Sequence, residues 1–283
     1  MLASVRYVCS LLAVQGYNTN LEMVNQEKKK KIWYQGFTDP EVHGVYVNKL
    51  QDHLDKISGE NVSTSFFGIS PPASHLHPIE ELRCSLIAIK NALKAEEAGY
   101  DAFVMGHFQE AGIHEIKSLV NIPVLSLGEA TLLYGCTLGR KMGLVTIDPI
   151  FIPWHEDQIQ RAGLEKRVVG VEAMDTSPAF YMDAFTNKDS CQIVIEQFRK
   201  RAQVLISKGA DVLVPAGGLP MLLLAENKIF EFDDAPVING INILVKLAEA
   251  ALLLQKIDGL GVSRRSSYKL PSEAALKEFK SIL

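Results

Sequence analysis

The sequence predicts an α/β fold of two similar halves with parallel sheets, related by a pseudo-twofold axis, with a site in the cleft between them. From residue 31 onward, short apolar runs alternate with longer amphipathic segments, which is the pattern of strands joined by crossover helices. Glycines follow two of the long helical segments, where a left-handed residue commonly ends a helix. Two pairs of segments also read as copies of each other, as expected for an internal repeat.

The elements of the first half follow from these patterns in chain order. Apolar runs bounded by turn residues predict strands over 31–37, 62–69, 101–106 and 122–127. Helical spacing of apolar residues predicts helices over 40–57, 79–99, 111–120 and 128–139. Because every strand is followed by a helix, the strands are expected to pair in parallel.

The second half is predicted to continue in the same order. Strands are expected over 141–147, 166–174 and 210–218, and helices over 153–163 and 191–209. Pro153 stands at the start of its helix, where its fixed φ is favourable. The segment 235–259 is expected to run from a strand directly into a long helix.

The internal repeat places two turns opposite each other. "EEAGYDAFVMGHFQEAGIHEI" and "ISKGADVLVPAGGLPMLLL" both read helix, glycine, strand, turn and helix, and "NIPVLSLGEATLLYG" is matched by "DAPVINGINILVKLA". Ligands of α/β proteins bind at the carboxyl ends of strands, so the paired turns are expected to form one cleft. We predict an amino-terminal extension over 1–30, a first domain of 31–126 with 236–283, and a second domain of 127–235.

The composition narrows the class of protein. The chain has 283 residues, 47% of them hydrophobic, and a net charge of −4, which gives no reason to expect a nucleic acid or a membrane as partner. Its four cysteines are scattered without a C-x-x-C pair, so we expect free thiols and a cytoplasmic location. Glycine fingerprints of dinucleotide or phosphate sites are missing, so no cofactor is expected. His75 and His77 have H-x-H spacing but lie in a proline-flanked loop, and no metal site is predicted.

Several stretches resemble the aspartate/glutamate/hydantoin racemase superfamily, and most closely its hydantoin racemase branch. They are "AGYDAFVMGHFQEAG", "IPVLSLGEA", "GADVLVPAGGLP", "PVINGINILVKLAEA" and "GLGVSRRSSYKLP", and the resemblance runs from about residue 31 to about 271. It implies a cofactor-independent isomerase with a small-molecule substrate, and a homo-oligomer, since relatives are commonly oligomers. In that family each half supplies one cysteine at its strand-end turn, and the two thiols exchange a proton with a carbon next to a carbonyl.

This chain departs from the family at both turns. His107 stands at the first cysteine position, with Glu110 in place of an aspartate, and Gly217 or Ala216 stands at the second. A histidine titrates near neutrality, so His107 is the predicted catalytic base, with Glu110 as its orienting partner or a second acid or base. Glu110 would equally suit a helix start, where a carboxylate interacts favourably with the helix dipole.

The substrate-binding residues are predicted from the same strand ends. Gly217 and Gly218 are expected to leave room for a bulky group and to offer backbone N–H donors to an oxyanion. Gln35 stands where the family places a polar residue, often Asn, near its substrate. Ser74 lies in a loop where relatives often carry hydroxyl donors, and Phe108 adds an aromatic surface.

Three functions remain open from the sequence. The first is a proton transfer, isomerisation or tautomerisation, next to a carbonyl with His107 as base. The second is a lyase or hydrolase reaction, such as decarboxylation or ring opening, in the same cleft. The third is a ligand-binding relative without catalysis, favoured by the glycines at the second turn and opposed by the titratable pair at the first.

Overall fold

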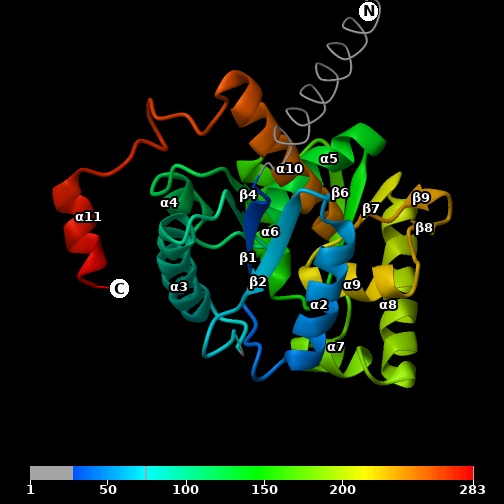
Figure 1. Ribbon diagram of the computed structural model, residues 1–283. Helices are drawn as coiled ribbons and strands as arrows, with labels where there is room; N and C mark the ends of the chain where they lie inside the picture. The colour runs from blue at the N-terminus through cyan, green and yellow to red at the C-terminus, as the bar shows by residue number, and fades with distance from the viewer. Residues whose placement is uncertain (1–27, 74, 283) are drawn as a thin grey trace, which may run out of the picture.

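The computed structural model describes residues 28–73 and 75–282, which form two parallel sheets flanked by helices (Figure 1). The strand order is β2-β1-β3-β4 in the first sheet and β6-β5-β7 in the second. The predicted α/β fold with parallel sheets in two halves is therefore confirmed. Most of the predicted extension, residues 1–27, lies outside the described residues, and so does Ser74.

The elements agree with the predicted segments to within a few residues, except that α7, β8 and α11 were not predicted. The strands are β1 (Lys30–Gln35), β2 (Val62–Phe67), β3 (Ala102–Met105), β4 (Val124–Ser126), β5 (Met142–Thr146), β6 (Val168–Ala173), β7 (Val212–Pro215), β8 (Glu231–Phe232) and β9 (Ala235–Pro236). The helices are α2 (Gly44–Ile57), α3 (Pro78–Glu97), α4 (Ile113–Lys117), α5 (Leu127–Leu138), α6 (Phe151–Arg161), α7 (Pro178–Ala184), α8 (Lys188–Ser207), α9 (Gly218–Glu226), α10 (Gly240–Asp258) and α11 (Glu273–Lys280).

The internal repeat is visible in the topology. Val237 pairs in parallel with Leu213 of β7, at the position that β4 takes beside β3 in the first sheet. The sheets therefore share one order, in which β5, β6, β7 and Val237 correspond to β1, β2, β3 and β4. The predicted pairs of similar segments are β3–α4 with β7–α9, and β4–α5 with Val237–α10.

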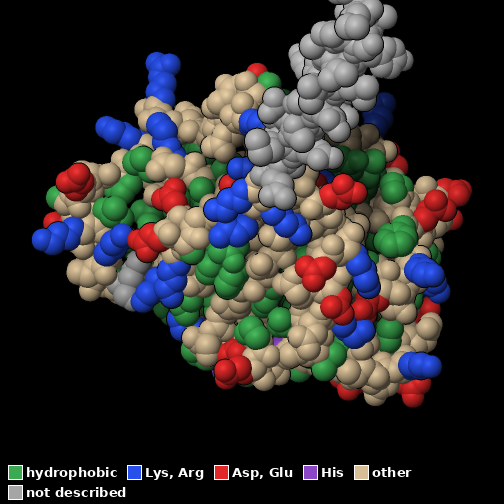
Figure 2. All heavy atoms as spheres, in the orientation of Figure 1, with side chains coloured by type: hydrophobic (Ala, Val, Ile, Leu, Met, Phe, Trp, Pro, Cys, Tyr) green, Lys and Arg blue, Asp and Glu red, His purple; other side chains and the backbone are tan. Residues whose placement is uncertain are grey.

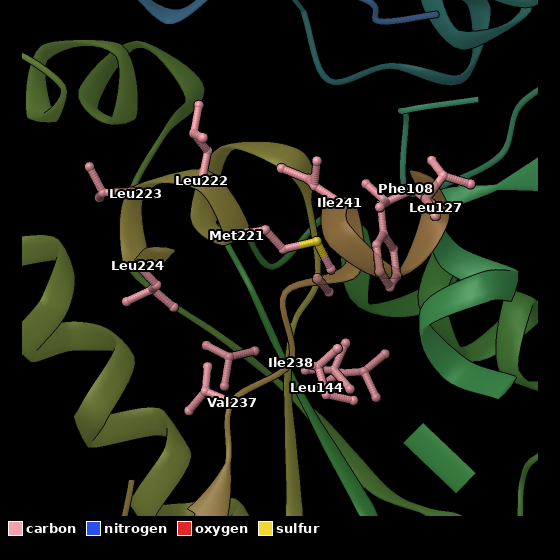
Figure 3. Close-up of a cluster of buried hydrophobic side chains, with 14 of the residues drawn as sticks. Phe108, Leu127, Leu144, Met221, Leu222, Leu223, Leu224, Val237, Ile238 and Ile241 are labelled. Carbon is pink, nitrogen blue, oxygen red and sulfur yellow. The ribbon is translucent and has the colours of Figure 1, made fainter. Parts of the chain in front are cut away.

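Alternation along the first sheet separates two apolar layers. Trp33 of β1 and Phe103 of β3 face a small core beneath α3 and α4. Tyr34 and Val104, each one residue further along, face the large core that continues into the second half. Side chains from the turn after β3, from β5, from α9 and from α10 meet in that large core, as Figure 3 shows for Phe108, Leu144, Met221 and Ile241. Tyr34 is therefore directed toward the junction of the halves.

Two long helices lie side by side where the halves meet (Figure 1). Helix α10 packs on β3 and β4 of the first sheet, whereas α5, which follows β4, packs on β7 of the second. The domain limits expected at residues 126 and 236 remain predictions. Beyond α10 the chain is held by Arg264, whose guanidinium donates to the carbonyls of Lys117 and Val120. Arg264 of "SRRSSY" thus fastens the segment after α10 to the first half, whereas Arg265 is exposed.

The described surface carries no strongly charged face in the view of Figure 2, where acidic and basic side chains are interspersed. Within residues 28–73 and 75–282, no helix is long and apolar enough to cross a membrane. The same residues contain no cluster of three or more His, Cys, Asp or Glu side chains that could hold a metal ion.

Candidate active site

A cavity of about 330 Å³ lies between the halves, at the carboxyl ends of the strands. Its wall from the first half comes from β1, the loop into α2, the loop before α3 and the turn after β3. The second half contributes residues after β5 and from α7, together with the turn after β7. The aromatic side chains of the wall are Tyr34, Phe37, Tyr46, Phe66, Phe108 and Phe151. Two turns that the sequence paired therefore line one cavity.

His107 is placed in this cavity by the end of β3. Gly106 precedes it, and a β-carbon on Gly106 would lie 2.1 Å from Cε1 of Tyr34, so only glycine allows the turn to pass so close to that ring. The imidazole stacks on Phe37 with 4.1 Å between the ring centroids. Its Nε2 lies 3.0 Å from Oε2 of Glu81, the fourth residue of α3.

Glu81 is the acidic partner of His107. Burial raises the pKa of the Glu81 carboxyl, but the His107 charge and hydrogen bond outweigh that effect, and the pKa is lowered overall. An ionised Glu81 accepts from Nε2–H of a neutral His107, which leaves the lone pair on Nδ1. Within the described residues no hydrogen bond to this Nδ1 is found, and His107 lines the cavity.

Glu110, the partner expected from the sequence, is turned away from the cavity. It is buried, with φ of 63°, and its Oε1 accepts from the hydroxyl of Ser126 and from the backbone N–H of Glu129 at 2.5 Å. The carboxylate therefore satisfies the N-terminus of α5. Of the two predicted interpretations of Glu110, the geometry favours the helix-start one.

The remaining predicted substrate residues divide between the wall and the interior. Phe108 lines the cavity, and its carbonyl accepts from Gln158 at 2.7 Å. Gln35 is fully buried under the cavity, where its amide binds the carbonyl of Gly36 at 2.8 Å and its oxygen accepts from Trp33 and Asn91. Gln35 thus holds strand ends together and does not line the cavity. Ser74 lies outside the described residues.

The second turn offers space and no acid or base. Gly217 lines the cavity with φ of 153°, a conformation nearly reserved for glycine, and its N–H donates to the carbonyl of Pro215 at 2.9 Å. That N–H is therefore not free for the oxyanion predicted from the sequence. A β-carbon on Gly218 would lie 3.2 Å from the hydroxyl oxygen of Tyr46 and 3.5 Å from the carbonyl oxygen of Gly106. The two turns almost touch at this point.

The wall between β1 and α2 holds polar atoms without partners. Tyr34 Oη, Thr38 Oγ1 and His43 Nδ1 are buried and make no hydrogen bond within the described residues. Burial lowers the pKa of His43, although the nearby Asp39 charge opposes the shift. All three residues line the cavity. Buried polar atoms are nearly always paired in folded proteins, so this cluster indicates a place for a polar ligand.

A second histidine, His155, is linked through Gln158 to the turn after β3 that carries His107. His155 of α6 is fully buried, and its Nε2 lies 3.1 Å from the hydroxyl of Thr146. Burial, with a smaller contribution from the His107 charge, lowers the pKa of His155 to about 4, although the hydrogen bond to Gln158 opposes the shift. Gln158 lies between His155 and the carbonyl of Phe108, so the group fixes the turn that carries His107.

Three site residues escaped the sequence reasoning. Glu81 lay in the helix predicted over 79–99, and His43 and Tyr46 lay in the helix predicted over 40–57, and none of them was singled out. The sequence signals for these residues were weak. Glu81 lies in the first turn of the helix that follows the second strand. Asp39-Pro40 marks a turn, so α2 begins only at Gly44 and His43 lies just before it. His77 caps α3 by accepting from Ile79 N–H, while His75 lines the cavity.

Comparisons with known proteins agree with this architecture. A family model described as Asp/Glu/Hydantoin racemase matches residues 46–248. The hydantoin racemase of Pseudomonas sp. (strain NS671) is 27% identical over 225 residues, which cover 78% of this chain and 86% of the relative. The solved allantoin racemase from Klebsiella pneumoniae has a TM-score of 0.73 at 18% identity and covers 86% of this chain and 94% of its own. The allantoin racemase from Pseudomonas fluorescens gives 0.72 at 19% identity, with 86% and 97% covered.

Proposed function

Because this chain belongs to the Asp/Glu/hydantoin racemase family, we propose that it is a cofactor-independent isomerase that moves a proton at a carbon next to a carbonyl. His107 is the base. The observation that carries the proposal is the pair of His107 and Glu81, with 3.0 Å between Nε2 and Oε2, in the wall of the cavity between the halves. Glu81 orients the imidazole and stabilises the imidazolium that forms when Nδ1 takes the proton.

The cavity suits a neutral, ring-bearing substrate. Its wall is rich in aromatic side chains, and no lysine or arginine occurs among the described residues that form it. A dicarboxylate would need such cations to offset its charge on leaving water. The matched relative is named a hydantoin racemase, and a hydantoin is a neutral ring with an acidic carbon beside a carbonyl. We therefore propose a 5-substituted hydantoin, or a close analogue of it, as substrate.

A lyase reaction is the second candidate, and one observation favours it. Gly217 and Gly218 leave the second turn without a side-chain acid, so His107 has no thiol opposite it. A single donor is sufficient to protonate a carbanion that is left after a bond to carbon is broken. In that case His107 would act as acid, and the product would differ from the starting compound in mass.

Proton exchange followed by NMR in D₂O tests the proposal. The D- and L-forms of 5-benzylhydantoin and of smaller hydantoins, together with amino acids and malonates, are incubated with the wild type and with His107→Gln. We expect deuterium to enter at the carbon beside the carbonyl, and the rate to fall by about 10²–10⁴-fold in the variant, the range typical of a lost general base. His114→Gln is the matched control, because His114 is exposed and bonds to Tyr268 outside the cavity.

The outcomes separate the candidate functions. Exchange that survives in His107→Gln contradicts the assigned base. A new product without exchange into the starting compound supports the lyase reaction. If no compound changes but one raises the melting temperature of the wild type, the protein binds its ligand without catalysis.

A further inference from the structure

Tyr34 holds a hydroxyl whose position folding does not explain. The side chain is 1% exposed at the end of β1, and Oη is buried without a hydrogen-bond partner among the described residues. Phenylalanine would fill the same space without burying an unpaired hydroxyl. Tyr34 lines the cavity, and a β-carbon on Gly106 would lie 2.7 Å from Oη. The hydroxyl thus occupies the space that a side chain at position 106, next to His107, would need.

Tyr46 mirrors this arrangement at the second turn. It projects from the first turns of α2 into the same cavity, and its Oη would lie 3.2 Å from a β-carbon on Gly218. The same β-carbon position on Gly218 lies 3.5 Å from the carbonyl oxygen of Gly106. Each strand-end turn therefore has a glycine with a tyrosine hydroxyl against it, and both tyrosines come from the first half of the chain.

Both phenols stay protonated at neutral pH. Burial raises the pKa of Tyr34 well above its usual range, and the neighbouring Tyr46 raises it further. Burial also raises the pKa of Tyr46. A phenol that cannot ionise is a poor base and a permanent hydrogen-bond donor. The two groups can therefore stabilise a negative charge that develops between them.

Proton removal beside a carbonyl creates such a charge. When Nδ1 of His107 takes the proton, the C–H electron pair becomes a carbon–carbon π bond and the carbonyl π pair moves to oxygen as an enolate. The return of a proton to carbon reverses both shifts. The proposed function rests on this intermediate. Of the two backbone donors expected from the sequence, Gly217 N–H is already bonded to the carbonyl of Pro215, which leaves Gly218 N–H at the start of α9 as the remaining backbone donor beside the tyrosine hydroxyls.

We propose that the hydroxyls of Tyr34 and Tyr46 form the oxyanion site, in which both donate hydrogen bonds to the substrate oxygen as it becomes an enolate oxygen. The ligand class is therefore a carbonyl compound whose oxygen reaches the point between the two turns while its acidic carbon faces His107. Preorganised donors act more strongly on the charged intermediate than on the neutral carbonyl. Their removal should accordingly lower kcat more than it raises KM.

The test compares Tyr34→Phe and Tyr46→Phe with Tyr181→Phe. Tyr181 is an equally buried tyrosine whose hydroxyl bonds to Met174 Sδ outside the cavity, so its variant controls for the loss of a buried phenol. The probes are D- and L-5-benzylhydantoin, and the readouts are deuterium exchange in D₂O, kcat and KM. We expect kcat to fall by about 10²–10³-fold in each cavity variant, as for the loss of one oxyanion donor, with KM within a few-fold of the wild type. Tyr181→Phe should keep the exchange rate.

A second readout does not depend on catalysis. Because Tyr34 Oη is unpaired, Tyr34→Phe should melt at or above the wild-type temperature, whereas a hydroxyl with a structural role would lower it. If Tyr34→Phe failed to fold, its structural role would be shown and the proposal would be overturned for that residue, leaving Tyr46→Phe to decide on the other donor.

The outcomes distinguish this inference from the proposed function. A wild type that exchanges no probe contradicts the proposed hydantoin chemistry itself. A wild type that exchanges the probes, with Tyr34→Phe and Tyr46→Phe equal to the control, overturns the oxyanion site and leaves His107 in place. A rise in KM with unchanged kcat also overturns it, because the hydroxyls would then bind substrate and intermediate equally.

Discussion

At the scale of single residues, two histidines of this site differ because of their surroundings. His107 faces the carboxylate of Glu81 and an open cavity. His155 faces a hydroxyl and an amide in the interior, where a charged ring would lack both water and a counter-ion. The same residue type therefore lies beside a carboxylate in one place and is buried among neutral groups in the other.

The buried state of His155 predicts how stability depends on pH. Its pKa is about 4 in the folded protein and about 6.5 when unfolded, so between these values the unfolded chain binds more protons. The free energy of unfolding should therefore fall as the pH drops from about 6.5 toward 4, by on the order of 3 kcal/mol in total. Urea unfolding at about pH 7 and about pH 5 measures this slope.

The control for that slope is His155→Gln, which keeps a neutral hydrogen-bonding side chain. The free energy of unfolding of this variant should depend less on pH than that of the wild type over the same interval. A smaller pH dependence should remain because of His43, whose pKa is also lowered. Glu81 and Asp39 titrate below this window, because the pKa of each is lowered. Equal slopes in the two proteins would contradict the neutral state assigned to His155.

Sequence reasoning singled out His107 because a titratable residue followed an apolar strand at a position that the family uses, and its role as base remains a prediction. It missed Glu81, because a glutamate in the first turn of a helix is ordinary and its contact with His107 spans 26 positions of the chain. It placed Gln35 at the substrate, whereas the structure buries Gln35 against the carbonyl of Gly36 and outside the cavity lining. The sequence does not distinguish these two orientations of a polar residue at a strand end. Contacts between distant segments decide such cases.

At the scale of elements, strand–helix alternation was readable because β3, β5 and β7 are continuous apolar runs, as expected when helices cover both faces of a parallel sheet. Helix α7 was missed because seven residues after a serine cap carry too little periodicity. The start of α2 was placed too early, because the side chain of Asp39 accepts from Glu41 N–H and holds a turn ahead of the helix.

The turn between β3 and α4 gives a prediction for Gly106→Ala. The added β-carbon would lie 2.1 Å from Cε1 of Tyr34, so the ring or the turn must move. We expect a loss of about 1–3 kcal/mol in the free energy of unfolding and a larger proportional loss of activity. Gly44→Ala is the control, because its β-carbon would meet nothing within 4 Å at the start of α2. A fully active and stable Gly106→Ala would show that Tyr34 has freedom that its packing does not indicate.

At the scale of the whole molecule, the halves are joined by a shared core and by an ion pair that is about one-third exposed. Nζ of Lys49, in α2 of the first half, lies 3.0 Å from the carboxylate of Glu226, in α9 of the second half. Both side chains are about one-third exposed, so solvent screens the attraction. The shared core, and not this pair, should therefore hold the halves together.

A double-mutant cycle with Lys49→Met and Glu226→Gln measures that attraction. We expect a coupling energy below about 1 kcal/mol that decreases further in high salt. The Lys246–Glu249 pair within α10 provides a local reference, with side chains that are 52% and 20% exposed. A coupling energy several times larger would mean that the pair controls how the halves close on a ligand.

The exchange of α5 and α10 between the halves has a consequence for synthesis on the ribosome. The first sheet is complete once β4 has emerged, yet the helix that covers β3 and β4 begins at Gly240, more than a hundred residues later. During translation the apolar face of β3 and β4 is therefore expected to stay exposed, or to be bound by a chaperone, until α10 leaves the ribosomal exit tunnel. The nascent chain is therefore expected to reach its native fold only after α10 has emerged, and a chain truncated before α10 should be prone to aggregate.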